Sequence, residues 1–402
     1  MKTEIKSFIT KYYLISFFSG LNFFSPFFVI FLNSIKLSPL QITIAIISAQ
    51  ISQFVFELPT GAIADRFSRK LSVLLGSVMF LIALLFFLFA DCFLMIVIGE
   101  IFCGIALSLN SGAFDALVYD NMKHFKIENK FAEYRGMSWA LKLAAISLSA
   151  FCASFIIENG FSFLIIASIL FVVIHGSILL TLKEYGMDNI RKINKNYTKL
   201  VKQTFSYLFK HNLLLKFSLF WGIAIGFIFI GLNFREFFIL EITYSKSLTA
   251  KLVVIMTISG ALGRAYFIKF LSNKHIKYSL YLLLFITFVF PIAFILYSFP
   301  ASFIIFVFYW TCLGSCTGML GAKNHQFTPS RYRASLESLT SMLQSIMVVL
   351  YLFVFGIIGN NFGYKAAFIW YSVIQLFVVI VFSYLLLKDK HLIKKENASI
   401  RN

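Results

Sequence analysis

Four ionisable residues lie inside long apolar stretches of the chain: Glu57, Glu100, Asp115 and Lys142. A charged side chain in apolar surroundings costs several kcal/mol unless a partner or a function compensates for it. Buried carboxyl groups can take up and release a proton, and a buried ammonium group can bind an anion. Proton exchange and ion pairing are therefore the chemistry that these residues offer.

The acids Glu100 and Asp115 belong to a polar series at helical spacing. Gly104, Ser108 and Ser111 stand between them, so that successive members are four, four, three and four residues apart. In one continuous helix this spacing places all five residues on a single face. The series predicts a polar stripe that faces a cavity or a partner helix.

A second helical face contains Arg135, Trp139 and Lys142. The segments that carry Asp115 and Lys142 are joined by a short connection and could be neighbours. We therefore expect Lys142 to pair with Asp115 or with Glu100. Such a pair could serve transport, or it could be a static salt bridge that joins two helices.

Glu57 and three other ionisable residues within apolar segments allow more than one interpretation. Glu57 is a candidate proton site or a partner in a conformational latch. His175 is alone in its apolar segment, which favours a hydrogen-bonded packing role. Arg235 and Glu236 are expected to mark the outer end of a span. No acid is expected to be buried in the C-terminal half, so proton coupling is expected in the N-terminal half.

The composition indicates what kind of element must position these residues. Hydrophobic residues make up 59% of the chain and charged residues 13%, against about 25% charged in ordinary globular domains. Several runs without any Asp, Glu, Lys or Arg, such as 71–90 and 366–387, approach the ~20 apolar residues that cross a bilayer as a helix. Period-two alternation, which is typical of a membrane β-barrel, is not sustained anywhere. The sequence predicts an all-α membrane protein.

Twelve spans are predicted. They lie near residues 12–34, 40–64, 71–90, 92–120, 133–157, 161–182, 213–238, 247–268, 278–298, 301–322, 334–359 and 364–387. With this threading, 28 Lys and Arg fall on the side of the two termini and five on the other side. Short loops rich in Lys and Arg stay in the cytoplasm. Both termini are therefore expected to be cytoplasmic, in the inner membrane.

The net charge of +19 is then explained by topology and by anionic membrane lipid, without a nucleic-acid partner. The long basic connection divides the chain into a six-helix bundle at 1–182, a cytoplasmic linker at 183–212, a second six-helix bundle at 213–387 and a cytoplasmic tail at 388–402. Weak similarity between the openings of the second and eighth spans agrees with two pseudo-symmetric halves.

A charged motif follows the second span. It contains Gly61, Asp65, Arg66, Arg69 and Lys70. This arrangement resembles the loop signature G-x-x-x-D-R-x-x-R-K of major facilitator superfamily (MFS) transporters, with Ser68 where Gly is frequent. A second stretch, 104–120, is similar to the fourth span of bacterial efflux-like members and ends in Tyr119-Asp120.

The resemblance implies the MFS fold of twelve transmembrane helices and a mechanism of alternating access. It also implies a conformational latch, in which Asp65 meets the start of span eleven and Arg69 pairs with Asp120. The alternative is that Arg66, Arg69 and Lys70 only mark the cytoplasmic side. Drug–proton antiporters of the family commonly carry a Gly-Pro signature in span five, which the segment after Gly136 lacks.

The leading functional prediction is proton-coupled export of small amphipathic or cationic compounds. The alternative is an uptake carrier for a nutrient or metal chelate, with Lys142 holding an anionic group. No phosphate-binding loop is present and the five cysteines lack metal-ligand spacing. We therefore expect no enzymatic activity, no cofactor and no metal. The expected partners are a small-molecule substrate, protons and membrane lipid, with the protein as a monomer.

Overall fold

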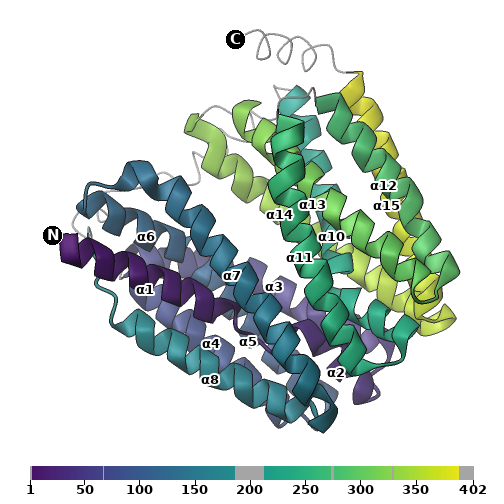
Figure 1. Ribbon diagram of the computed structural model, residues 1–402, viewed down its shortest axis with the longest axis horizontal. Helices are drawn as coiled ribbons and strands as arrows, with labels where there is room; N and C mark the ends of the chain where they lie inside the picture. Colours follow the sequence, from purple (N-terminus) through teal and green to yellow (C-terminus); the bar gives the residue numbers. More distant parts are fainter. Residues whose placement is uncertain (1, 67, 186–211, 273–275, 328–329, 389–402) are drawn as a thin grey trace. The chain divides into compact units, whose positions relative to one another are not determined.

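The computed structural model describes residues 2–66, 68–185, 212–272, 276–327 and 330–388, and within some helices the backbone alone is described. The described residues form helices and short connections, without strands. The long helices are α1 (Lys2–Gly20), α3 (Pro39–Arg66), α4 (Arg69–Leu88), α5 (Phe93–Asn110), α6 (Ala113–His124), α7 (Phe131–Ile156), α8 (Phe161–Leu180), α10 (Asn212–Thr243), α11 (Lys246–Ser272), α12 (Ile276–Leu296), α13 (Ala301–Phe327), α14 (Ser330–Phe362) and α15 (Tyr364–Leu387). Figure 1 labels these helices along the chain.

Nine segments of the described chain are helical, long enough and apolar enough to cross a membrane. The other three predicted spans, 213–238, 247–268 and 301–322, coincide with α10, α11 and α13. The all-α membrane fold predicted from composition is confirmed. Each predicted span has a helix in its place.

The first span is interrupted, which the sequence analysis did not predict. The helix α1 ends at Gly20 and α2 (Phe28–Ser34) follows a short 3₁₀ turn, η1 (Ser25–Phe27). The freed backbone groups find side-chain partners. The amides of Phe23 and Phe24 donate to Ser168 Oγ at 3.0 and 3.1 Å, and Ser149 Oγ donates to the Asn22 carbonyl at 3.3 Å. A break in a membrane helix is stable only when neighbouring groups satisfy its backbone in this way.

The predicted fourth span is also divided. Between α5 and α6, Gly112 has φ +71°, a left-handed conformation that ends one helix and redirects the next. The prediction that Glu100 and Asp115 share one continuous face is therefore wrong. Glu100 lies on α5 and Asp115 in the first turn of α6.

The contacts divide the chain into two compact units, each described by itself. Unit 1 comprises Met1–Asn194 together with Ser245–Val254, and unit 2 comprises Lys195–Tyr244 and Ile255–Asn402. Most of the predicted linker, 183–212, and of the predicted tail, 388–402, lies outside the described residues, and the predicted domain bounds stay predictions. In unit 1, the start of α11 is fixed because Ser247 N donates to Glu158 Oε1 at 3.2 Å and Ser247 Oγ donates to the Ser154 carbonyl at 3.0 Å.

Close packing in unit 1 centres on α3 and α5. Gly104 faces α3 so closely that a Cβ atom there would overlap the Ala49 carbonyl oxygen and lie 2.7 Å from Ser52 Cβ. Ser52 Oγ in turn donates to the Ile101 carbonyl at 2.8 Å. Small residues at such contacts allow membrane helices to approach each other.

The core of unit 2 is aromatic. Phe290 of α12 stacks on Tyr309 of α13, with ring centroids 3.7 Å apart. Phe294 stacks on Phe368 of α15 at 5.1 Å. The many Phe of the chain thus serve partly to bind helices to one another, since aromatic pairs add stability beyond the area that they bury.

Candidate functional site

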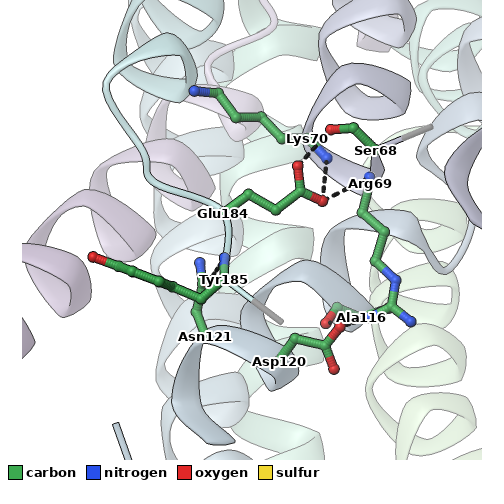
Figure 2. A network of polar contacts seen from close by, with 8 residues as sticks. All are labelled: Ser68, Arg69, Lys70, Ala116, Asp120, Asn121, Glu184 and Tyr185. Carbon is green, nitrogen blue, oxygen red and sulfur yellow. Dashed lines mark hydrogen bonds and ion pairs between the residues drawn. The ribbon is translucent and has the colours of Figure 1, made fainter. Parts of the chain in front are cut away.

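Arg69, at the start of α4, forms an ion pair with Asp120 of α6. Its Nη1 also donates to the Ala116 carbonyl at 3.0 Å. Figure 2 shows both contacts, and the two charged side chains are 18% and 22% exposed. The structure therefore contains the Arg69–Asp120 pair that the motif predicts. The role of this pair as a conformational latch stays a prediction.

A second carboxylate, Glu184, lies against the first turn of α4. It accepts hydrogen bonds from Ser68 Oγ and from the Arg69 amide, the latter at 2.8 Å. Ser68 has extended backbone angles and accepts from Leu71 N at 2.9 Å, so it is the N-cap of α4. The exposed amides and the positive end of a helix dipole make a helix N-terminus a favourable place for a carboxylate.

The segment that carries Glu184 is also fastened to α6. Asn121 is fully buried, its Nδ2 donates to the Lys183 carbonyl at 3.0 Å, and its Oδ1 accepts from Tyr185 N at 2.9 Å. The Tyr185 ring stacks on His124 with centroids 4.0 Å apart. We call Ser68, Arg69, Asp120, Asn121, Glu184 and Tyr185 the Arg69 network, which Figure 2 shows joining α4, α6 and the segment after α8.

Within this network, the sequence motif predicts only Arg69 and Asp120. Ser68 could have been recognised, because a serine directly before an apolar helix is a typical N-cap. Glu184 and Tyr185 could not, since they reach α4 and α6 across more than 60 residues of intervening chain. Lys70 is placed nearby, and its Nζ donates to the Leu180 carbonyl at 2.7 Å.

The other motif residues are only partly described. The helix α3 continues through Gly61 and Asp65 to Arg66, but the side chains of residues 61–67 lie outside the described ones. The predicted contact of Asp65 with the start of span eleven falls there as well, so it remains a prediction.

The ion pair of Asp115 differs from the expectation. Asp115 Oδ2 pairs with Arg135 Nη2 at 2.7 Å, not with Lys142. The division of the fourth span at Gly112 places Asp115 at the start of a new helix, beside the first turns of α7. Lys142 lies two turns further along α7, and its Nζ is 5.4 Å from the centroid of the Trp139 ring.

Glu100 is the most enclosed acid of unit 1. The residue is 8% exposed on α5, and its carboxyl group forms neither an ion pair nor a hydrogen bond in the described part of the chain. Glu57, near the end of α3, is half-buried, and its carboxyl group is equally without a partner there. A charge on either carboxylate is costly in apolar surroundings, and proton uptake removes that cost.

His175 lies on α8, where its Nδ1 is 3.3 Å from Ser77 Oγ of α4. Such a contact between two adjacent helices agrees with the packing role that was favoured for this histidine.

Unit 2 contains a buried acid, although none was expected in the C-terminal half. Glu236 of α10 is 3% exposed and forms an ion pair with its neighbour Arg235. The expectation that no acid is buried in the C-terminal half is therefore wrong. Sequence position misled here because α10 extends to Thr243, so that Arg235 and Glu236 lie seven or eight residues inside the helix, about 10–12 Å from its end.

Comparisons with known proteins agree with this architecture. A family model described as Major Facilitator Superfamily matches residues 12–324. An uncharacterized MFS-type transporter, YxaM of Bacillus subtilis (strain 168), is 23% identical over 374 residues, which are 90% of this chain and 92% of the relative.

Two solved structures are similar in fold at low identity. The nucleoside transporter NupG has a TM-score of 0.77 at 15% identity, and the match covers 96% of this chain and 99% of NupG. A D-xylose-proton symporter has a TM-score of 0.74 at 13% identity, and the match covers 94% of this chain and 97% of the symporter. At these identities the likeness concerns the fold alone.

Proposed function

Because the chain belongs to the Major Facilitator Superfamily, and is thus a multi-pass membrane transporter and not an enzyme, we propose that it is a proton-coupled secondary carrier. It works by alternating access between two helical bundles at 1–182 and 213–387, with both termini in the cytoplasm. The leading substrate class is small amphipathic or cationic compounds, which it exports.

The observation that carries this proposal is the buried carboxyl group of Glu100, which has no partner among the residues that the structure describes. An ionisable residue inside a membrane helix is a functional-site candidate by default, because its cost must be compensated. When Glu100 is protonated it is neutral and tolerates apolar surroundings. When it loses the proton it offers a negative charge to a cationic substrate. Glu57 is the second candidate for this proton exchange. Asp115 is the third, because its carboxylate already pairs with Arg135.

The Arg69 network is proposed as part of the conformational latch, together with Gly61, Asp65, Arg66 and Lys70. The ion pair of Arg69 with Asp120 and the capping of α4 by Glu184 support this role, because they hold the motif loop in one place. In the family that this motif typifies, the loop closes the cytoplasmic side.

Ethidium, a cationic amphipathic dye, tests the proposal in cells and in proteoliposomes with an imposed pH gradient. We expect gradient-driven ethidium extrusion, and loss of it in Glu100→Gln at normal protein level. Glu128→Gln is the matched control, because Glu128 is exposed on η2 (Glu128–Lys130). Extrusion that ignores the gradient, or that persists in Glu100→Gln, would contradict the proposal.

A second candidate is uptake of a compound with an anionic group, and one observation favours it. Lys142 is partly buried, and in the described residues no carboxylate pairs with it. The neighbours of similar fold include a proton symporter, which agrees with uptake. This candidate predicts substrate accumulation, and loss of accumulation in Lys142→Met with a normal amount of folded protein.

A further inference from the structure

Residues 181–185 follow α8 as a turn and an irregular segment, which we call the strap. Asn121 of α6 holds the strap backbone at two points, with hydrogen bonds of 2.9 and 3.0 Å. Figure 2 shows the Glu184 side chain pointing toward α4 and the Tyr185 ring pointing away from it. The latch proposed above accounts for Glu184 and assigns no task to the Tyr185 ring.

The Tyr185 ring lies flat on a histidine ring. His124 ends α6, and its ring is parallel to that of Tyr185 within 5°, with the centroids 4.0 Å apart. The Phe125 ring meets Tyr185 edge-on at 5.5 Å, and Tyr185 packs against the apolar core of unit 1. Because Asn121 fixes the strap backbone and Phe125 borders the ring, a charge on His124 acts on a contact of defined geometry.

Three features of this place favour a proton on His124. The C-terminal end of a helix attracts a cation, and His124 lies in the last turn of α6. The face of a phenol ring, here that of Tyr185, attracts a cation too. In addition, the carboxylate of Glu4 on α1 lies within electrostatic range of His124.

Other charged side chains stand on the elements that meet here: Lys11 of α1, Asp120 and Lys123 of α6, Lys126 just beyond α6, and Lys183 and Glu184 of the strap. The two acids are held by Arg69 and by the first turn of α4. The nearest lysines in sequence, Lys123, Lys126 and Lys183, are exposed, so water and salt screen their repulsion of a charged His124. The Tyr185 ring touches His124 directly, and its attraction is screened least.

We propose that His124 and Tyr185 form a sensor of the pH at this end of unit 1, in which a proton on His124 tightens the strap. Histidine is the side chain that ordinarily changes its charge between about pH 5 and pH 8. The imidazole takes the proton from solvent at its free ring nitrogen, and the neutral stack becomes a cation–π contact. The tightened strap keeps Glu184 on the first turn of α4, so the motif loop opens less often. With this end in the cytoplasm, as proposed above, acidification of the cytoplasm slows transport.

The effect on transport rests on the proposed function, whereas the pH response of the strap does not. The strap is therefore measured directly, by hydrogen–deuterium exchange of the full-length protein in detergent at about pH 6 and about pH 8. Dividing each exchange rate by the intrinsic rate at the same pH leaves the opening equilibrium alone. The Tyr185 amide, which donates to Asn121 Oδ1, is the reporter.

We expect the protection of the Tyr185 amide to be about two- to fivefold higher at the lower pH, the gain that a cation–π contact at an exposed site provides. His124→Gln takes up no proton and should show the lower protection at both pH values. His124→Arg carries a permanent planar cation and should show the higher protection at both. His175→Gln, which removes a histidine of α8 in the same unit, should respond like the wild type.

Equal protection of the wild type at both pH values, or a response that persists in His124→Gln, would overturn the proposal. Tyr185→Leu keeps an apolar side chain on the core without a ring face, and a pH response of the same amide in this variant would overturn the role of Tyr185.

Ethidium extrusion plays no part in the exchange measurement, so either proposal can fail while the other holds. Where extrusion occurs, His124→Arg should extrude ethidium more slowly than His124→Gln under the same pH gradient, because its strap stays tight. Equal extrusion rates of these two variants would overturn the effect of the strap on transport.

Discussion

Gly104 illustrates how single residues set the spacing of helices in this protein. The position lies directly against the backbone of α3, with no room for a methyl group. We predict that Gly104→Ala destabilises the fold by about 1–3 kcal/mol through overpacking. Thermal unfolding in detergent, followed by a thiol-reactive dye that detects newly exposed cysteines, measures this.

Gly176→Ala is the matched control for Gly104→Ala. Gly176 is helical, and no atom lies within 4 Å of the Cβ that it would gain. Alanine there should be neutral or slightly stabilising, because it restricts the unfolded chain. If the two variants unfold at the same temperature, the tight contact at Gly104 is not what limits stability.

The sequence predicted individual side chains best where a motif fixed them. The pairing of Arg69 with Asp120 followed from the loop signature, and the structure contains that ion pair. The pairing of Lys142 with Asp115 or Glu100 was inferred from helical spacing and a short connection, and it was wrong, because Asp115 pairs with Arg135. Spacing assumes a continuous helix, and a glycine such as Gly112 occurs both inside helices and at their ends, so the break could not be seen in advance.

At the scale of elements, Glu184 joins a segment beyond α8 to the N-terminus of α4. Glu184→Ala should free the first-turn amides of α4 at a cost of about 1 kcal/mol, as for the loss of an N-cap. Hydrogen–deuterium exchange of residues 69–71 should then be several times faster than in the wild type, because local opening requires less energy. Glu128→Ala is the control, and unchanged exchange at Arg69 would contradict the capping role.

The helices themselves were predictable because runs without charge are long and the bilayer allows few other elements. The breaks within the helices were less predictable from the sequence. The break between α1 and α2 depends on Ser149 and Ser168, which satisfy its backbone from α7 and α8. These hydrogen bonds come from helices distant in the sequence, so the local sequence around Asn22 does not predict the break.

At the scale of the whole molecule, the predicted orientation can be tested with native Cys92. This cysteine is exposed immediately before α5, on the side that the charge distribution places outside the cell. We expect a membrane-impermeant maleimide to label the protein in intact cells and to fail with Cys92→Ser. In that background, Glu128→Cys should be labelled only after permeabilisation. Labelling of Glu128→Cys in intact cells would reverse the orientation.

The membership of Ser245–Val254 in unit 1 has a consequence for synthesis. The main part of unit 1 ends at Asn194, and its last piece ends 60 residues later at Val254. At ribosomal rates of ~5–20 residues per second, about 3–12 s separate the two. During that interval the Ser154 carbonyl and the Glu158 carboxylate lack the hydrogen bonds that Ser247 later donates to them. The first half of the protein is therefore completed only when its second half has begun to emerge.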